Sequence, residues 1–294
     1  MSGIRKLTRH CGRYGISAKH IQVSYFRYTA PKRPRGGKQR KFQVSTPKQR
    51  NLNDKRSRRY FEALVLSNFV KGDLHITTTY DEEHKPKDIK EAMRNVDNFI
   101  KRINNKRKKK GLPSAKYVCV TEEGGKTGRI HHHFIMDGAL DRDTVESKWG
   151  LGYCNADRIQ PDKKKELAPL IGYLSKDPKG RKRWSSSHNL VRPWDTVNDD
   201  PRMMSGRRME LMKDLPEDSE AMKKIIEDDN PGYELDEVEK EYREEIGQWY
   251  FFCRMKLKPS ANKNESVGKE KPKDNGKRGS PGWTGGAKRA SPPL

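Results

Sequence analysis

Long hydrophobic runs are absent from this sequence of 294 residues. A membrane-spanning helix needs about 20 consecutive apolar residues, and no stretch approaches that length. The N-terminus carries charge without the apolar segment of a signal peptide. Cysteine is scarce as well, and the spacing of Cys11, Cys119, Cys154 and Cys253 fits neither a disulfide framework nor a zinc ribbon. We therefore expect a cytoplasmic protein in a reducing compartment, with no membrane partner.

Apolar residues make up only 31% of the chain, whereas charged residues make up 35%. This composition predicts one modest hydrophobic core with solvated arms. The formal net charge is +24 and is spread unevenly, because residues 1–60 contain 18 Lys or Arg and a single acid, Asp54. A polyanion is the natural partner of such a chain.

The basic N-terminal region, residues 1–50, is predicted to be an arm. Its cations alternate with aromatic residues, which suits contacts with phosphates and stacking on bases. A disordered, solubilising arm would have the same composition, so both interpretations stay open. A basic amphipathic helix capped by Asn53 is predicted over residues 54–70. Away from its apolar face it carries Arg56, Arg58 and Arg59.

Strands and helices alternate from residue 74 onward. The clearest helix is residues 86–110, where apolar side chains recur at helical spacing from Ile89 to Ile103. The order predicts an α+β fold with a ferredoxin-like or RRM-like antiparallel sheet. The expected elements are strand 74–80, helix 86–110, strand 116–122, strand 129–136, helix 141–149, strand 152–159 and helix 162–176.

The charge changes sign in residues 210–245, which contain 15 acids and five bases. This block could fold back on the arm, mask it, or solvate a linker, and we expect the linker. A helix is predicted at residues 219–227, followed by a hairpin of strands 234–242 and 248–257 with its aromatic side chains in the core. From residue 259 the composition predicts a disordered basic tail.

Three adjacent histidines mark the expected strand 129–136. Side chains alternate along a strand, so His131 and His133 would face one way and His132 the other. Glu122 ends the preceding strand and can reach the same spot. Two imidazoles and a carboxylate suit a divalent metal ion and leave positions open for substrate oxygens. The alternative is a polar patch on an exposed strand.

Tyr173 is the candidate nucleophile for such a site. A helix packed on the sheet could present its phenol to the metal, and a tyrosyl oxygen can form a covalent phosphodiester. Lys176 lies one helical turn further and could stabilise phenolate or phosphate charge. On its own, a helical tyrosine followed by a lysine at this spacing is ordinary.

In this combination and order, the motifs resemble those of the HUH endonucleases. The resemblance is to the rolling-circle replication initiators of small plasmids and single-stranded DNA phages, and it covers about residues 50–256. It rests on the threonine-rich strand 76–80, the Glu-x-Gly and Arg-x-His-x-His segment 122–133, and the Tyr-x-x-Lys segment 173–176. The chain departs from the pattern at His132, where the family usually has a bulky apolar residue.

The resemblance implies a five-stranded RRM-like nicking domain over residues 51–200, followed by the acidic segment and hairpin over residues 201–258. In such a domain Tyr173, assisted by Lys176, attacks one strand at a replication origin. The products are a 5′-phosphotyrosine and a free 3′-hydroxyl, and the strand is later rejoined without ATP. The implied cofactor is Mg²⁺ or Mn²⁺, held by His131, His133 and Glu122.

The resemblance also implies partners. These are single-stranded DNA or an origin hairpin, a host helicase and a host polymerase, which would place a phage or plasmid protein in the host cytoplasm. The candidate DNA contacts are Arg56, Arg58, Arg59 and Arg129. Two alternatives remain: a single-tyrosine HUH transposase, and a non-catalytic nucleic-acid-binding protein with an RRM-like sheet.

Overall fold

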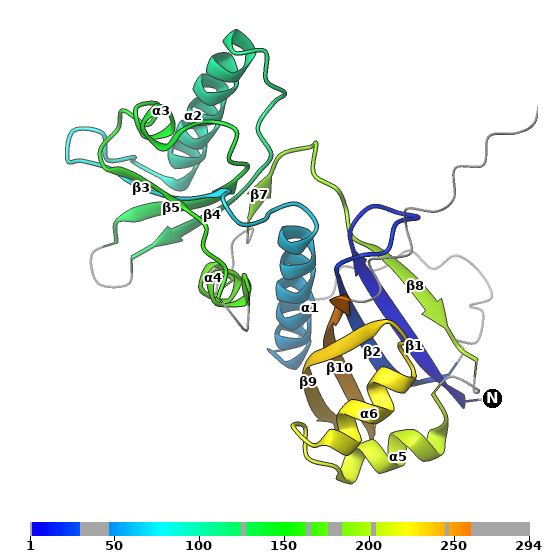
Figure 1. Ribbon diagram of the computed structural model, residues 1–294. Helices are drawn as coiled ribbons and strands as arrows, with labels where there is room; N and C mark the ends of the chain where they lie inside the picture. Colours follow the sequence, from blue (N-terminus) through cyan, green and yellow to red (C-terminus); the bar gives the residue numbers. More distant parts are fainter. Residues whose placement is uncertain are drawn as a thin grey trace, which may run out of the picture. The chain divides into compact units, whose positions relative to one another are not determined.

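The computed structural model describes residues 2–29, 47–124, 128–162, 166–175, 184–200, 204–244 and 247–259. The chain divides into two units after Lys258, and the first unit, Met1–Lys258, holds the described elements. Two five-stranded antiparallel sheets and six helices are found in these residues, which confirms the predicted α+β class (Figure 1). Apart from Pro259, the predicted tail lies outside the described residues.

The first sheet has the strand order β6-β3-β5-β4-β7. Its first four strands in the chain, together with helices α2 and α3, follow the β-α-β-β-α-β order of the ferredoxin-like fold. The elements predicted here are present with bounds close to the expected ones, and β7 is an addition. The bounds are β3 (Leu74–Thr79), α2 (Ile89–Lys109), β4 (Tyr117–Glu123), β5 (Ile130–Met136), α3 (Arg142–Glu146), β6 (Cys154–Arg158) and β7 (Ser185–Ser186).

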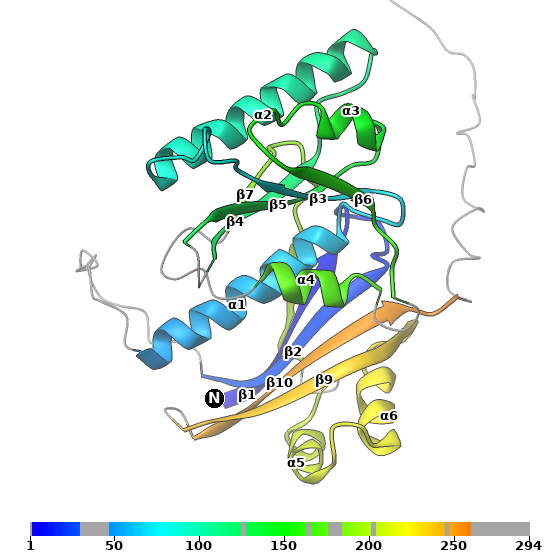
Figure 2. The ribbon, with the colours of Figure 1, turned by 90° about the vertical axis from the view of Figure 1, so that its left-hand side faces the viewer.

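Helices cover both faces of the first sheet, as Figure 2 shows. On one face α2 and α3 pack over Phe134 and Trp149, which are fully buried. On the other face lie α1 (Pro47–Leu66) and α4 (Ala168–Leu174), whose apolar side chains pack with Ile135. Phe134 and Ile135 are adjacent in β5, so the alternation of the strand divides its side chains between the two cores.

Helix α4 is shorter than the predicted helix over residues 162–176. The backbones of Asp162 and Glu166 are paired, with N···O distances of 2.9 and 3.1 Å, and Glu166 adopts a left-handed φ of 46°. A left-handed residue cannot continue an α-helix, so the helix begins only after this turn. Pro169, in the first turn, lacks the N–H that a helix interior needs.

The second sheet has the strand order β8-β1-β2-β10-β9. Helices α5 and α6 cover one of its faces, where Met212 and Ile226 belong to the same core as Val23 and Phe251. The predicted helix 219–227 and the terminal hairpin are both present. The bounds are β1 (Ser2–Cys11), β2 (His20–Thr29), β8 (Trp194–Asn198), α5 (Gly206–Asp214), α6 (Glu220–Asp228), β9 (Tyr233–Arg243) and β10 (Gln248–Leu257).

The structure corrects the prediction of an arm for residues 1–50, because β1 and β2 are central strands of this sheet. The strand cations meet acids far along the chain: Lys6 Nζ lies 2.8 Å from Asp229 Oδ2, and Arg9 Nε lies 2.8 Å from Asp195 Oδ1. Asp229 belongs to the acidic block, so that block folds onto the basic strands and is not the expected linker. Composition alone does not reveal pairing over such a separation.

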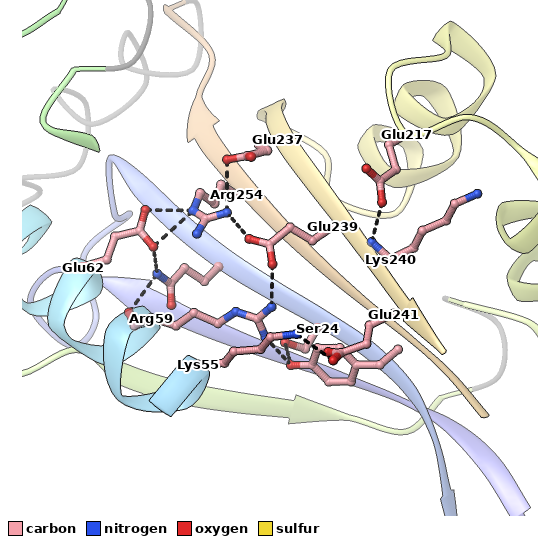
Figure 3. Close-up of polar contacts among 12 residues, drawn as sticks. Ser24, Lys55, Arg59, Glu62, Glu217, Glu237, Glu239, Lys240, Glu241 and Arg254 are labelled. Carbon is pink, nitrogen blue, oxygen red and sulfur yellow. Dashed lines mark hydrogen bonds and ion pairs between the residues drawn. The ribbon is translucent and has the colours of Figure 1, made fainter. Parts of the chain in front are cut away.

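Helix α1 begins earlier than the predicted start at residue 54, so Asn53 lies inside it and is not its cap. One side of α1 belongs to the core of the first sheet, and the other carries charges that meet the second sheet (Figure 3). Glu62 accepts hydrogen bonds from Arg254 at 2.9 and 3.1 Å, and Arg59 donates to Glu239 at 2.9 Å. The helix is therefore held by an apolar and an ionic face.

Gly152 provides a test of the packing between β6 and the end of β3. Its φ is +132°, and a Cβ there would lie 2.5 Å from the Asp81 backbone nitrogen. We expect Gly152→Ala to lower the free energy of unfolding by about 2–4 kcal/mol. In the control, Gly150→Ala, the φ of +64° meets open space, and the expected loss is about 1 kcal/mol. Equal losses in urea denaturation would show that the close contact carries no cost.

Candidate active site

The three histidines of β5 divide between the two faces of the first sheet. His133 contacts Tyr173 of α4, and its ring is also stacked on His75 of β3, with centroids 5.9 Å apart. His132 points to the opposite face, toward Trp149, and is completely buried. His131 lies two residues from His133 and therefore on the same face of the strand.

Glu122 lies directly across from His131 in the register of β4 and β5. Residues directly opposite each other in an antiparallel pair project from the same face, so Glu122 and both candidate histidines share one face. On the other side of β5, Thr77 Oγ1 lies 3.2 Å from His133 Nδ1. In the tautomer that protonates Nδ1, this hydroxyl accepts the hydrogen bond and leaves Nε2 available as a ligand.

The donor set on this face suits a divalent metal ion, since it combines two imidazoles with a carboxylate. Burial, followed by the charges of His75 and His131, lowers the pKa of His133 to about 4. Its imidazole is therefore neutral at pH 7, the form that binds metals. Within the described residues, no group of three or more His, Cys, Asp or Glu side chains converges in a position to hold a metal ion. The candidate ligands thus share a face and a register.

Tyr173 is brought to this face by α4. Its ring meets the ring of His133 edge-on, with the centroids 5.4 Å apart, and 44% of the residue remains exposed. Its neighbours Ile171 and Leu174 are buried and fix the helix against the sheet. The phenol is therefore both beside the histidines and accessible to a substrate. Lys176 lies outside the described residues.

His132 forms the centre of a buried hydrogen-bond chain on the opposite face. Tyr80 Oη lies 2.8 Å from His132 Nε2, and Thr121 Oγ1 lies 2.9 Å from His132 Nδ1. Burial raises the pKa of Tyr80 to about 12, so its hydroxyl stays protonated and can donate to Nε2. Thr121 in turn can donate to Met93 Sδ at 3.5 Å. This neutral imidazole, with its pKa lowered by burial to about 3, replaces the apolar residue usual at this position of the family pattern.

His75 was not singled out in the sequence, yet it lines the same face as His133. Its Nε2 is buried and has no hydrogen-bond partner among the described residues. In the register of β3 and β6, Thr77 is opposite Asn155 and His75 is opposite Asp157, so two more polar side chains emerge on this face. Alternation in strand 74–80 places His75, Thr77 and Thr79 together, and this was the available signal.

The candidate DNA contacts have different environments. Arg56 and Arg58 are exposed on α1. Arg59 is buried and pairs with Glu239, and its guanidinium lies 3.6 Å from the centroid of the Phe252 ring. Arg129 precedes β5 and pairs with Glu82 at the surface.

Residues 73–178 match a family model of replication-associated proteins, the ORF2 family. The matched segment runs from β3 through α4, so it contains the three histidines, Glu122 and Tyr173 but none of the second sheet. The match supports a rolling-circle replication initiator family and a role in DNA replication. No curated protein and no solved structure matches the chain significantly. No helix among the described residues has the length and apolar character to cross a membrane.

The two faces of β5 make opposite predictions for histidine substitutions. His132→Ala leaves the hydroxyls of Tyr80 and Thr121 without their partner and opens a cavity beside Trp149, so we expect a loss of about 3–5 kcal/mol in unfolding free energy. His131→Ala, on the partly exposed face, should cost less than about 1 kcal/mol. Urea denaturation of both variants measures this contrast. A stability loss at His131 as large as that at His132 would contradict the division of roles.

Proposed function

We propose that this protein is a replication initiator that nicks one DNA strand at an origin and later rejoins it. The observation that carries the proposal is the contact between the Tyr173 ring and His133, on the face where Glu122 lies opposite His131. This arrangement assembles a phenol, two imidazoles and a carboxylate from two strands and a helix. The match to replication-associated proteins covers these same residues and favours an initiator over a transposase.

In the proposed reaction, the Tyr173 oxygen attacks the phosphorus of a single-stranded phosphodiester. A new bond forms between phosphorus and the phenolic oxygen as the phenol loses its proton. The bond from phosphorus to the 3′ oxygen breaks, and that oxygen gains a proton. The products are a 5′-phosphotyrosine and a free 3′-hydroxyl that can prime synthesis by a host polymerase.

His131, His133 and Glu122 are the proposed metal ligands. A bound Mg²⁺ or Mn²⁺ would polarise the scissile phosphate and stabilise charge on the departing oxygen. The Thr77 hydroxyl holds the His133 ring in orientation, as outer-shell partners of metal-binding histidines do. Lys176 is proposed to stabilise negative charge on the phenolate or the phosphate.

Rejoining follows from the same chemistry in reverse. The phosphotyrosine is itself a phosphodiester, so a 3′-hydroxyl can displace Tyr173 and restore the DNA bond without ATP. A host helicase is the proposed source of strand separation. Single-stranded DNA or an origin hairpin is the proposed substrate, with Arg129 close to the first histidine in the chain as a phosphate contact.

The nucleophile can be tested directly with labelled single-stranded oligonucleotides from the protein's own replicon. With Mn²⁺ or Mg²⁺, the wild type should form a covalent adduct on the 5′ side of the break, visible on a denaturing gel. Tyr173→Phe should reduce adduct formation by about 10³-fold or more while leaving DNA binding intact. The matched control is Tyr153→Phe, an exposed tyrosine on the same domain. An undiminished adduct in Tyr173→Phe would move the nucleophile elsewhere.

Metal dependence provides an independent test. Chelation with EDTA should abolish adduct formation, and Mn²⁺ or Mg²⁺ should restore it. His131→Ala and His133→Ala should each reduce the restored rate by about 10²-fold or more, since each removes a proposed ligand. Binding of Mn²⁺ can be followed separately by isothermal titration. Full activity in EDTA would exclude the proposed metal-assisted mechanism, and tight DNA binding with no adduct would favour a non-catalytic binding protein.

A further inference from the structure

A groove lies between α1 and the face of the second sheet that α5 and α6 leave uncovered. Its volume is about 590 Å³, within the range of about 300–1,000 Å³ that is usual for ligand sites. Five aromatic and four arginine side chains line it, and no acid is among the lining residues. The complete lining is Leu7, Arg9, Gln22, Ser24, Phe26, Asn53, Arg56, Ser57, Arg59, Tyr60, Trp184, Arg243, Tyr250 and Phe252.

The register of the second sheet places its aromatic residues together on this face. Phe26 of β2 is opposite Tyr250 of β10, and Ser24 is opposite Phe252. The rings of Phe26 and Tyr250 are stacked, with centroids 5.9 Å apart and an interplanar angle of 27°. Both residues are only partly buried, so ring surface remains available. Tyr60 adds an aromatic ring from α1, on the other wall of the groove.

The arginines extend this aromatic platform. The guanidinium of Arg243 lies 3.7 Å from the centroid of the Tyr250 ring, and that of Arg9 lies 5.4 Å from the centroid of the Tyr60 ring. Planar guanidinium groups can stack on bases as well as bind phosphates. Such a surface presents flat faces and positive charge side by side.

Arg243 has bonding capacity to spare. Its Nε is buried without a hydrogen-bond partner among the described residues. Desolvation, together with the positive charges of Arg56 and Arg59, lowers the pKa of Arg243 even though Tyr250 and Glu241 oppose the shift. Arg56 is exposed at the groove. An anionic ligand would relieve this concentration of positive charge.

We propose that this groove is a second site that binds single-stranded DNA, with bases stacked on Phe26, Tyr60 and Tyr250 and phosphates held by Arg56 and Arg243. A single strand offers both exposed base faces and a regular row of anions, which a protein segment or a duplex does not. The groove lies on the second sheet, outside the segment that matches replication proteins. Binding there is separate from the proposed chemistry of Tyr173.

The test measures the affinity of the full chain, carrying Tyr173→Phe to prevent nicking, for fluorescein-labelled oligo(dT). An oligonucleotide of about 15 nucleotides is long enough for one single-strand-binding site, and EDTA removes metal-dependent contacts at the histidines. Fluorescence anisotropy over a range of salt concentrations gives both the affinity and its salt dependence.

Two further substitutions, each matched with a control, probe the groove. Phe26→Ala should weaken binding by about 5-fold to 150-fold, the effect of removing one base-stacking aromatic. Arg56→Ala should weaken it less and reduce the slope of log affinity against log salt by about 0.7. The controls are Tyr242→Ala, an exposed tyrosine on the other face of β9, and Lys101→Ala, an exposed lysine on α2. Neither should change affinity by more than about 2-fold.

Arg56 is exposed, so its variant keeps the test valid if thermal denaturation shows that Phe26→Ala disturbs the fold. Photocrosslinking with oligonucleotides containing 5-iododeoxyuridine gives a direct readout, and the expected adducts lie on peptides containing Phe26, Tyr60 or Tyr250. Unchanged affinity in Arg56→Ala, or crosslinks confined to the first sheet, would overturn the proposal. Neither result would affect the nicking assay with origin oligonucleotides, so the two proposals fail separately.

Discussion

Helix α1 is held between the two sheets by two different kinds of interaction, and the placement of both candidate sites depends on it. Toward the first sheet, Phe61, Leu64 and Val65 are almost completely buried. Toward the second, Glu62 is buried and accepts from Arg254 and from the Gln22 amide. Removing one member of a buried ion pair costs about 3–5 kcal/mol, because its partner loses compensation. Hydrophobic burial is not directional, so the ionic face is what sets the rotation and register of α1.

The same helix links the nucleophile to the groove. Ile171 and Leu174 of α4 share a hydrophobic core with α1, and this packing positions Tyr173 beside His133. The opposite wall of α1 contributes Tyr60 and Arg56 to the groove. A shift of α1 would therefore alter both surfaces together. Packed interiors do not deform continuously, which makes such a helix a rigid support for two sites.

Strand β5 separates folding from chemistry residue by residue. His132 and Phe134 belong to the face covered by α2, where a neutral imidazole completes a chain of hydrogen bonds. His131 and His133 belong to the face where α4 leaves Tyr173 partly exposed. A central strand suits this division, since its neighbours β3 and β4 fix its register on both sides. Thr77 and Glu122 reach the histidines from those two neighbours.

The first sheet could be predicted from the sequence because its signals are local. The apolar repeat of α2 and the β-branched strands carry periods that a short window reveals. The candidate site was predictable for the same reason, since strand alternation alone places His131 and His133 together. His75 was missed because its relation to His133 depends on which strand lies next to β5, and the sequence does not state that order.

The second sheet could not be predicted, because its partners are far apart in the chain. Strand β1 pairs with β8 and neutralises Arg9 with Asp195, a contact across most of the sequence. Within a short window, β1 and β2 are basic segments with scattered aromatics, the composition that is typical of a disordered arm. The acidic block has the complementary error, since its charges acquire structural meaning only when they meet those strands. The groove is built from the same distant segments, so no motif marks it.

A strand-transfer enzyme that works through phosphotyrosine has to keep two DNA ends under control. The covalent bond would retain the 5′ end at Tyr173, whereas the 3′ end leaves as a free hydroxyl. Rejoining requires a 3′-hydroxyl near the phosphotyrosine, and a second single-strand site raises the local concentration of DNA without any new chemistry. The groove on the second sheet supplies such a site on the far side of α1. Because it makes no contact with the reacting atoms, its affinity could vary without altering the chemistry on the first sheet.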